Sequence, residues 1–194
     1  MPYLNSHTTI QVTVRPSGTP SRGPGSSSAD VSADGHLVAF NSYNVDLAPG
    51  DADKDADLFI RDLTTNQTRL LSAGVPAGMN PYGVVISPDG RWVSSRWDDS
   101  SLHLTRVDTA LTSQVAAEGY AQLGSFSSQL GRFVFVSGGR PYVRDLATGV
   151  STAISTPSGG GLVTSVSISG NGQFAAYDWV PDDGGVSVIY RVAL

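Results

Sequence analysis

The feature that most constrains the fold is one short pattern that occurs four times. Each copy has an apolar segment, a tight turn with Gly at its end, and a second apolar segment. The copies are VSADGHLVAF (31–40), ISPDGRWVSS (86–95), SSQLGRFVFV (127–136) and ISGNGQFAAY (168–177), with turn glycines Gly35, Gly90, Gly131 and Gly172. Glycine provides the positive φ that such turns need. Each copy therefore predicts a β-hairpin.

A third apolar segment follows each hairpin, at 57–63, 102–108, 141–147 and 186–192. A fourth segment completes the first three units, at 67–72, 112–117 and 150–155. No stretch shows a helical period. Units of four antiparallel strands and about 40–45 residues are typical of propeller blades. The sequence predicts an all-β fold, namely a small β-propeller with four blades of four antiparallel strands.

The expected blades fill one domain, residues 1–194. They span about 27–72, 82–117, 121–155 and 163–194. The last unit runs out of chain before its fourth strand, and the segment 8–14 (TTIQVTV) has the matching phase. We therefore expect the N-terminal strand to close the last blade, because an open ring exposes strand edges. A half-ring that associates with a second copy is the alternative, and the closed monomer is preferred.

Composition excludes several classes of function. The net charge is -5, with 17 acidic and 12 basic side chains, which argues against nucleic acid as a partner. Cysteine is absent, so disulfides and thiolate sites are excluded. No apolar run approaches the roughly 18 residues of a membrane span. The N-terminus shows no basic and apolar regions of a signal peptide.

The repeated segments resemble the bacterial TolB-like, WD-like propeller repeats. In that family S-x-D-G-[RKH]-x-[VI]-A-F opens a blade, and a strand such as DLFIRDL (57–63) follows. The resemblance covers nearly the whole chain, although the third copy lacks the Asp and the fourth has Asn171 there. It implies a secreted, periplasmic or surface-associated bacterial protein that binds a protein or a glycan. It implies no catalytic residue.

An acidic segment, PGDADKDADLFIRDL (49–63), interrupts the first blade between its second and third strands. It places carboxylates on alternate positions, at Asp51, Asp53, Asp55 and Asp57. An EF-hand is rejected, because a strand follows and Ala56 stands where the sharp turn needs Gly. Oxygen ligands without a nearby His favour Ca²⁺. The sequence predicts a calcium site here, and a solvated acidic loop is the alternative.

A second candidate site lies where the second strands of blades two and four end. Trp97 and Trp179 occupy equivalent positions there, and acidic residues follow both. Exposed indole rings suit a sugar or a peptide, although both could instead cover blade edges. The candidate ligand-binding residues are Arg96, Trp97, Asp98, Asp99, Asp178 and Trp179. Arg96 and Asp178 either face a central channel or pair with neighbours.

The remaining motifs give little support to catalysis. His7, His36 and His103 have no metal-binding spacing and are expected at the surface or in turns. No G-x-S-x-G elbow and no phosphate-binding glycine loop occurs. We expect a non-catalytic propeller module that binds a protein or glycan, with Ca²⁺ as a stabilising ion. The alternatives are an enzyme (a lyase, hydrolase or cyclase) with its site in the central pocket, and a structural half-ring that self-associates.

Overall fold

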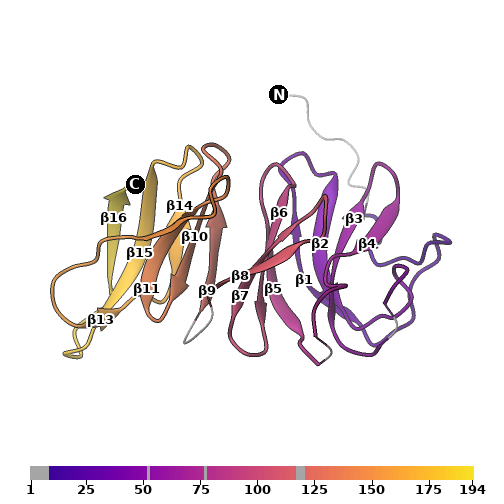
Figure 1. The fold of residues 1–194 in the computed structure, drawn as a ribbon, viewed down its shortest axis with the longest axis horizontal. Helices are drawn as coiled ribbons and strands as arrows, with labels where there is room; N and C mark the ends of the chain where they lie inside the picture. Colours follow the sequence, from indigo (N-terminus) through magenta and orange to yellow (C-terminus); the bar gives the residue numbers. More distant parts are fainter. Residues whose placement is uncertain (1–8, 52, 77, 117–120) are drawn as a thin grey trace.

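The structure, a computed structural model, describes residues 9–51, 53–76, 78–116 and 121–194. Within these ranges, sixteen strands form four antiparallel sheets that follow one another along the chain (Figure 1). The predicted all-β fold of four four-stranded units is confirmed. The same ranges contain no helix of the length and apolarity needed to cross a membrane.

Each sheet is one blade, and in blades 1 to 3 the strands pair in chain order. Blade 1 has β1 (Ser26–Val31), β2 (Leu37–Ser42), β3 (Asp57–Asp62) and β4 (Gln67–Leu70). Blade 2 has β5 (Pro81–Ile86), β6 (Trp92–Trp97), β7 (Leu102–Arg106) and β8 (Thr112–Ala116). Blade 3 has β9 (Gln122–Phe126), β10 (Arg132–Ser137), β11 (Arg140–Asp145) and β12 (Ser151–Ala153).

Blade 4 has four strands but is narrower than the others. Its strands are β13 (Gly161–Leu162), β14 (Val166–Ile168), β15 (Phe174–Pro181) and β16 (Val188–Ala193). β13 and β14 pair with successive parts of β15, and the register between them shifts by one residue. A similar shift interrupts β1, β5 and β9, so β13 and β14 together fill the first-strand position. The fourth-strand position, beside β16, is not filled by any described residue.

Apolar side chains between neighbouring blades form the core. We call the face of a blade toward the next blade its leading face, and the opposite face its trailing face. The seam between blades 1 and 2 contains Ala39, Leu58 and Ile60 against Val84, Ile86 and Val93. The next seam contains Leu102 and Leu104 against Phe126, Phe133 and Phe135. The last contains Val134 and Val136 against Ala175, Tyr177 and Trp179. Burial of these side chains is the main force that stacks the blades.

The turn of the third hairpin differs from the prediction by one residue. In each hairpin a serine hydroxyl accepts a hydrogen bond from the N–H five residues later; these serines are Ser32, Ser87, Ser127 and Ser169. Counted from Ser127, the position of the turn glycine belongs to Leu130, which has φ 61°. Gly131 comes one residue later, so Phe133 is equivalent to Val93 and not to Trp92. The hairpin has the same length as the other three, so aligning the copies on Gly131 assigns the side chains of β10 to the wrong seams.

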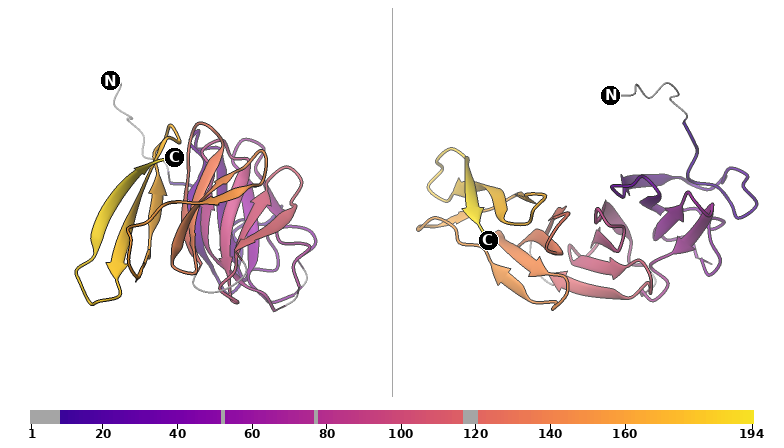
Figure 2. Two further views of the ribbon diagram at one scale, coloured as in Figure 1. Left: turned by 60° about the vertical axis from the view of Figure 1, so that its left-hand side comes forward. Right: turned by 90° about the horizontal axis from the view of Figure 1, so that it is seen from above.

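The described residues do not show the predicted closure of the ring by the N-terminal strand. Seen from above, the blades form an open arc whose two ends stand apart (Figure 2). Residues 9–13 form no strand, and Val14 pairs only with Pro20 in an isolated bridge. Val12 packs on blade 1 beside Phe40 and Phe59 rather than beside β16. Residue 8 of the predicted strand lies outside the described residues.

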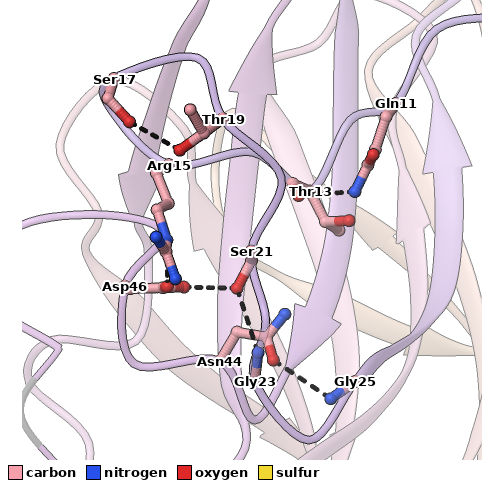
Figure 3. A network of polar contacts seen from close by, with 10 residues as sticks. All are labelled: Gln11, Thr13, Arg15, Ser17, Thr19, Ser21, Gly23, Gly25, Asn44 and Asp46. Carbon is pink, nitrogen blue, oxygen red and sulfur yellow. Dashed lines mark hydrogen bonds and ion pairs between the residues drawn. The ribbon is translucent and has the colours of Figure 1, made fainter.

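Polar contacts hold the N-terminal segment against the loop that follows β2 (Figure 3). Arg15 forms an ion pair of 2.5 Å with Asp46, which also accepts a hydrogen bond from the hydroxyl of Ser21. The side-chain oxygen of Asn44 accepts the N–H of Gly25 at 3.1 Å. From the same loop, Leu47 and Ala48 are buried against Phe40 and Phe59. The segment and loop together cap the trailing face of blade 1.

Candidate metal centre

The acidic segment forms the end of the long loop between β2 and β3, on blade 1. Asp57 is the first residue of β3, whereas Asp51 and Asp53 belong to the loop. The N–H of Ala56 donates to the side-chain oxygen of Asn80 at 2.7 Å, which fixes the loop to the start of blade 2. The first residue of β3, Asp57, therefore lies close to two aspartates of the preceding loop, Asp51 and Asp53.

Three of the four predicted carboxylates converge. Asp51, Asp53 and Asp57 each offer a carboxylate oxygen, and these oxygens lie within 4.8 Å of one another. Asp51 and Asp57 are half-buried, and Asp53 is exposed. The group could hold a metal ion, because its donors are all oxygens that can surround one point. Asp55 lies outside this group, and its Oδ2 accepts the N–H of Gly78 at 2.6 Å.

The surroundings of the triad disfavour three negative charges. Burial, with the charges of Asp57 and Asp53, raises the pKa of Asp51 to about 6. Burial also raises the pKa of Asp57, although the hydrogen bond donated by Ser72 opposes this. Oδ1 of Asp51 is buried and accepts no hydrogen bond. A buried acceptor without a donor is costly, and a bound cation would satisfy it.

The expectation that Trp97 and Trp179 expose their rings is wrong. Trp97 is 1% exposed, and its indole Nε1 donates to the hydroxyl of Ser95 at 3.1 Å. Trp179 is 8% exposed and lies in the seam between blades 3 and 4, close against Gly161. Blade 3 also stands between the two tryptophans. The two side chains contribute to the core, and neither offers a ring face to a ligand in this structure.

The polar residues beside the tryptophans are held by neighbouring groups. Arg96 donates to the carbonyl of Ala121 at 3.3 Å and lies over the ring of Tyr82. Asp178 accepts the backbone N–H groups of Thr164 and Ser165 within its own blade.

Asp98 and Asp99 also have partners. The amide nitrogen of Asn80 donates to Asp98 at 2.7 Å, and this Asn80 is the residue that anchors the acidic loop. Asp99 accepts from the N–H and the hydroxyl of Ser101. Asp98 thus belongs to the surroundings of the acidic triad, whereas Asp99 belongs to a polar network in blade 2.

That network contains a serine and a histidine which the sequence analysis did not connect. The hydroxyl of Ser101 lies 2.8 Å from Nε2 of His103, a spacing that also suits a nucleophile and its base. However, Ser101 is 0% exposed, and the imidazole of His103 packs beside Trp97 with ring centroids 5.3 Å apart. No substrate reaches this hydroxyl, so the pair orders the buried end of the hairpin. The sequence did contain a signal for this position of His103. Apolar and polar residues alternate along β7 (LHLTR), and this alternation places His103 within a strand rather than in a turn.

Protonation of His103 is expected to destabilise the protein. Burial lowers the pKa of His103 below its usual 6.5, and the charge of Asp99 only partly offsets this. The stability that depends on the neutral ring is therefore present above pH 6.5 and is lost as the pH falls toward the lower folded-state pKa. Urea unfolding at pH 7.5 and 5.5 should show a larger loss for the native chain than for His103→Asn. Equal losses would contradict this.

Comparisons with known proteins identify the architecture. No protein-family profile matches the chain, and no curated protein sequence matches it. Porphyromonas gingivalis dipeptidyl peptidase 4 is similar in structure, with a TM-score of 0.65 and 14% identity over 87% of this chain and 31% of that one. The Cps50 (Swd1) β-propeller domain of Myceliophteria thermophila gives 0.54 and 16% over 81% and 50%. The fold is that of β-propeller blades.

A third similar structure is Kuenenia stuttgartiensis hydrazine synthase, with a TM-score of 0.57 and 14% identity over 98% of this chain and 49% of that one. The chain thus spans between 31% and 50% of the length of these three proteins. At such identities the likeness concerns the propeller fold, and the chemistry of the sites has to be argued from the residues themselves.

Proposed function

We propose that this chain is a non-catalytic, TolB-like propeller module that holds Ca²⁺ at Asp51, Asp53 and Asp57 and binds a protein or glycan partner. The observation that supports the proposal is the convergence of these three carboxylates within 4.8 Å, together with the buried, unpaired Oδ1 of Asp51. A solvated loop would spread like charges apart, because they repel one another.

Ca²⁺ fits the donors better than other common ions. It takes six to eight oxygen ligands in flexible geometry, and carboxylates, backbone carbonyls and water all serve. Mg²⁺ demands a stricter octahedron and keeps more of its water. Zinc and copper prefer His and Cys, which are absent from the triad. The proposed ion would neutralise charge that burial makes unfavourable at Asp51 and Asp57.

The ion would act on the cap of blade 1. Asp51 and Asp53 lie in the loop that buries Leu47 and Ala48 on the trailing face, and Asp57 begins β3. One ion bound to all three would tie the loop to the sheet beneath it. The exposed carboxylates of Asp53 and Asp98 and the half-buried carboxylate of Asp55 lie around this position. We place the partner-binding surface there rather than on the buried tryptophans.

The proposed setting follows from the TolB-like resemblance, which favours a secreted, periplasmic or cell-surface bacterial protein. Extracellular Ca²⁺-binding modules commonly have dissociation constants of about 0.1–1 mM, since that matches the free ion outside cells. A modest affinity at this site would therefore be sufficient.

Isothermal titration calorimetry of the metal-free chain with CaCl₂ tests the proposal. We expect a single site with a Kd below about 1 mM and weaker binding of Mg²⁺. Asp51→Asn and Asp57→Asn should each weaken Ca²⁺ binding at least about tenfold, because each removes a charged ligand. Asp183→Asn is the matched control, since this exposed acid lies in the turn before β16, and Asp55→Asn should also have little effect.

Two outcomes would contradict the metal site. The first is no heat of binding at millimolar Ca²⁺, and the second is an equal loss of affinity in the Asp183→Asn control. Glycan and peptide arrays probed with and without Ca²⁺ test partner binding separately. Signals that depend on Ca²⁺ and disappear in Asp51→Asn would support the proposed surface, and arrays without any signal would count against the partner classes.

A further inference from the structure

We propose that a hollow beside the cap of blade 1 binds a carboxylate group, and that the buried guanidinium of Arg61 recognises this group. The hollow has a volume of about 390 Å³. Its walls come from the tight turn that begins at Arg15 (Figure 3), from the loop between β2 and β3, and from β4 with the turn before it. The lining residues are Pro16, Pro49, Asn66, Gln67, Thr68 and Arg69.

Arg61 is a buried charge whose hydrogen-bond partners are neutral. It lies on β3 and is 5% exposed. Its Nη1 donates to the hydroxyl of Thr68 and its Nη2 to the side-chain oxygen of Asn66, both at 3.2 Å. None of the carboxylates that the structure describes forms an ion pair with Arg61, and its buried Nε donates to no described group. A buried charge is costly unless it is paired, and a bound carboxylate would supply the pair.

The guanidinium of Arg61 lies next to the hollow, because Asn66 and Thr68 both bind it and both line the hollow. Asn66 is exposed, so a ligand oxygen can replace its side-chain oxygen at Nη2 of Arg61. The side-chain amides of Asn66 and Gln67 and the hydroxyl of Thr68 are further donors for that ligand. A guanidinium with neutral donors around it suits an oxyanion.

The equivalent positions in blades 2 and 3 indicate that the hairpin itself does not require a buried arginine. Thr105 and Arg144 pair with their neighbouring strands in the register of Arg61. Thr105 is 0% exposed and its hydroxyl lies 2.9 Å from that of Thr112. Arg144 donates to the hydroxyl of Ser151 at 3.0 Å, but it is only half-buried. Among these three positions, only that of Arg61 combines a charge with nearly complete burial.

The charges around the hollow favour a carboxylate over a dianion such as phosphate. Arg69 also lines the hollow, but its Nη2 already donates to the carbonyl of Val107 at 2.6 Å. Arg61 therefore supplies one available positive charge, which matches one carboxylate. Asp51 follows Pro49 by only two residues, and its charge would repel a dianion more than a monoanion.

Titration calorimetry of the metal-free chain with sodium succinate, at an ionic strength held constant with NaCl, tests the proposal. We expect one saturable site per chain. Arg61→Gln should weaken binding at least about tenfold, because it removes the charged donor. Arg144→Gln is the matched control, since it removes the arginine of the same strand position in blade 3, and it should bind like the native chain. Circular dichroism checks that both variants fold.

Asn66→Asp provides a second test that leaves Arg61 in place. It puts a carboxylate of the chain itself beside Nη2 of Arg61, in an exposed turn where the change is compatible with folding. We expect a higher melting temperature without succinate, because the buried charge gains a partner, and succinate binding at least about tenfold weaker.

The source of the carboxylate is tested with N-acetylglutamate amide and, as its neutral control, N-acetylglutamine amide. Binding of the glutamate compound alone would assign the hollow to an acidic side chain of a partner protein. Binding of succinate alone would assign it to a free organic acid.

Four outcomes would overturn the proposal. The first is no binding of succinate or N-acetylglutamate amide up to about 10 mM, the weak end of specific binding. The second is an equal loss of affinity in Arg144→Gln and Arg61→Gln. The third is tighter binding of inorganic phosphate than of succinate, and the fourth is an Asn66→Asp chain that binds succinate like the native chain.

Discussion

Replacing Trp97 by alanine is expected to lower the free energy of unfolding by about 3–5 kcal/mol, the range for an aromatic side chain removed from a core. Trp97 is 1% exposed, and its loss would leave a cavity beside His103 and remove the donor to Ser95. For a chain of this size the melting temperature should fall by about 10 °C or more. Urea denaturation followed by circular dichroism measures the change.

Two control variants separate packing from surface effects. Trp97→Phe keeps most of the apolar volume and loses only the hydrogen bond to Ser95, so it should cost less than half as much as alanine. Leu111→Ala removes an exposed apolar side chain and should change stability by less than about 0.5 kcal/mol. A Trp97→Ala chain as stable as the Leu111→Ala chain would show that the ring is not part of the core.

Alanine at Gly124 is expected to cost about 3 kcal/mol or more. Gly124 lies in the bulge of β9, where the register against β10 shifts between Leu123 and Phe126. A Cβ there would lie 2.0 Å from the carbonyl oxygen of Val134 on β10, and backbone atoms cannot move aside as a flexible side chain can. The strain would spread to Phe133 and Phe135 in the seam with blade 2.

Gly131→Ala provides the comparison for Gly124→Ala. Gly131 has φ 53°, but a Cβ there meets no atom within 4 Å. Only the left-handed backbone should be penalised, by about 1–2 kcal/mol. Chemical denaturation should therefore rank Gly124→Ala well below Gly131→Ala in stability. The reverse order would mean that β9 can move away from β10 at little cost.

Local patterns predicted most of the strands. Alternating apolar residues and turn glycines located all four hairpins, the third strand of every blade and the fourth strand of blades 1 to 3, because strand and turn preferences act over a few residues. The shift at Leu130 was missed. Serine, not glycine, fixes the hairpin through its hydrogen bond to the N–H of Arg132, and a left-handed leucine is uncommon.

The candidate site was predicted in part. Alternate spacing identified Asp51, Asp53 and Asp57 as neighbours, yet Asp55 turned away because the N–H of Gly78 binds it. Ser72 and Asn80, which position Asp57 and the loop, come from segments distant in sequence. Trp97 was mistaken for a surface residue, although its even spacing from Val93 and Ser95 on β6 places it on the same face as buried side chains.

By itself the sequence determined the blades, since each one is built from contacts between strands that are close along the chain. Only the tertiary structure decided where the N-terminal segment lies. Val12 could pair beside β16 or cover Phe40, and the apolar trailing face of blade 1 together with the Arg15–Asp46 pair favoured the second. The position of Val12 depends on apolar side chains that are distant in sequence and are brought together only when blade 1 folds. A local pattern of residues therefore could not predict it.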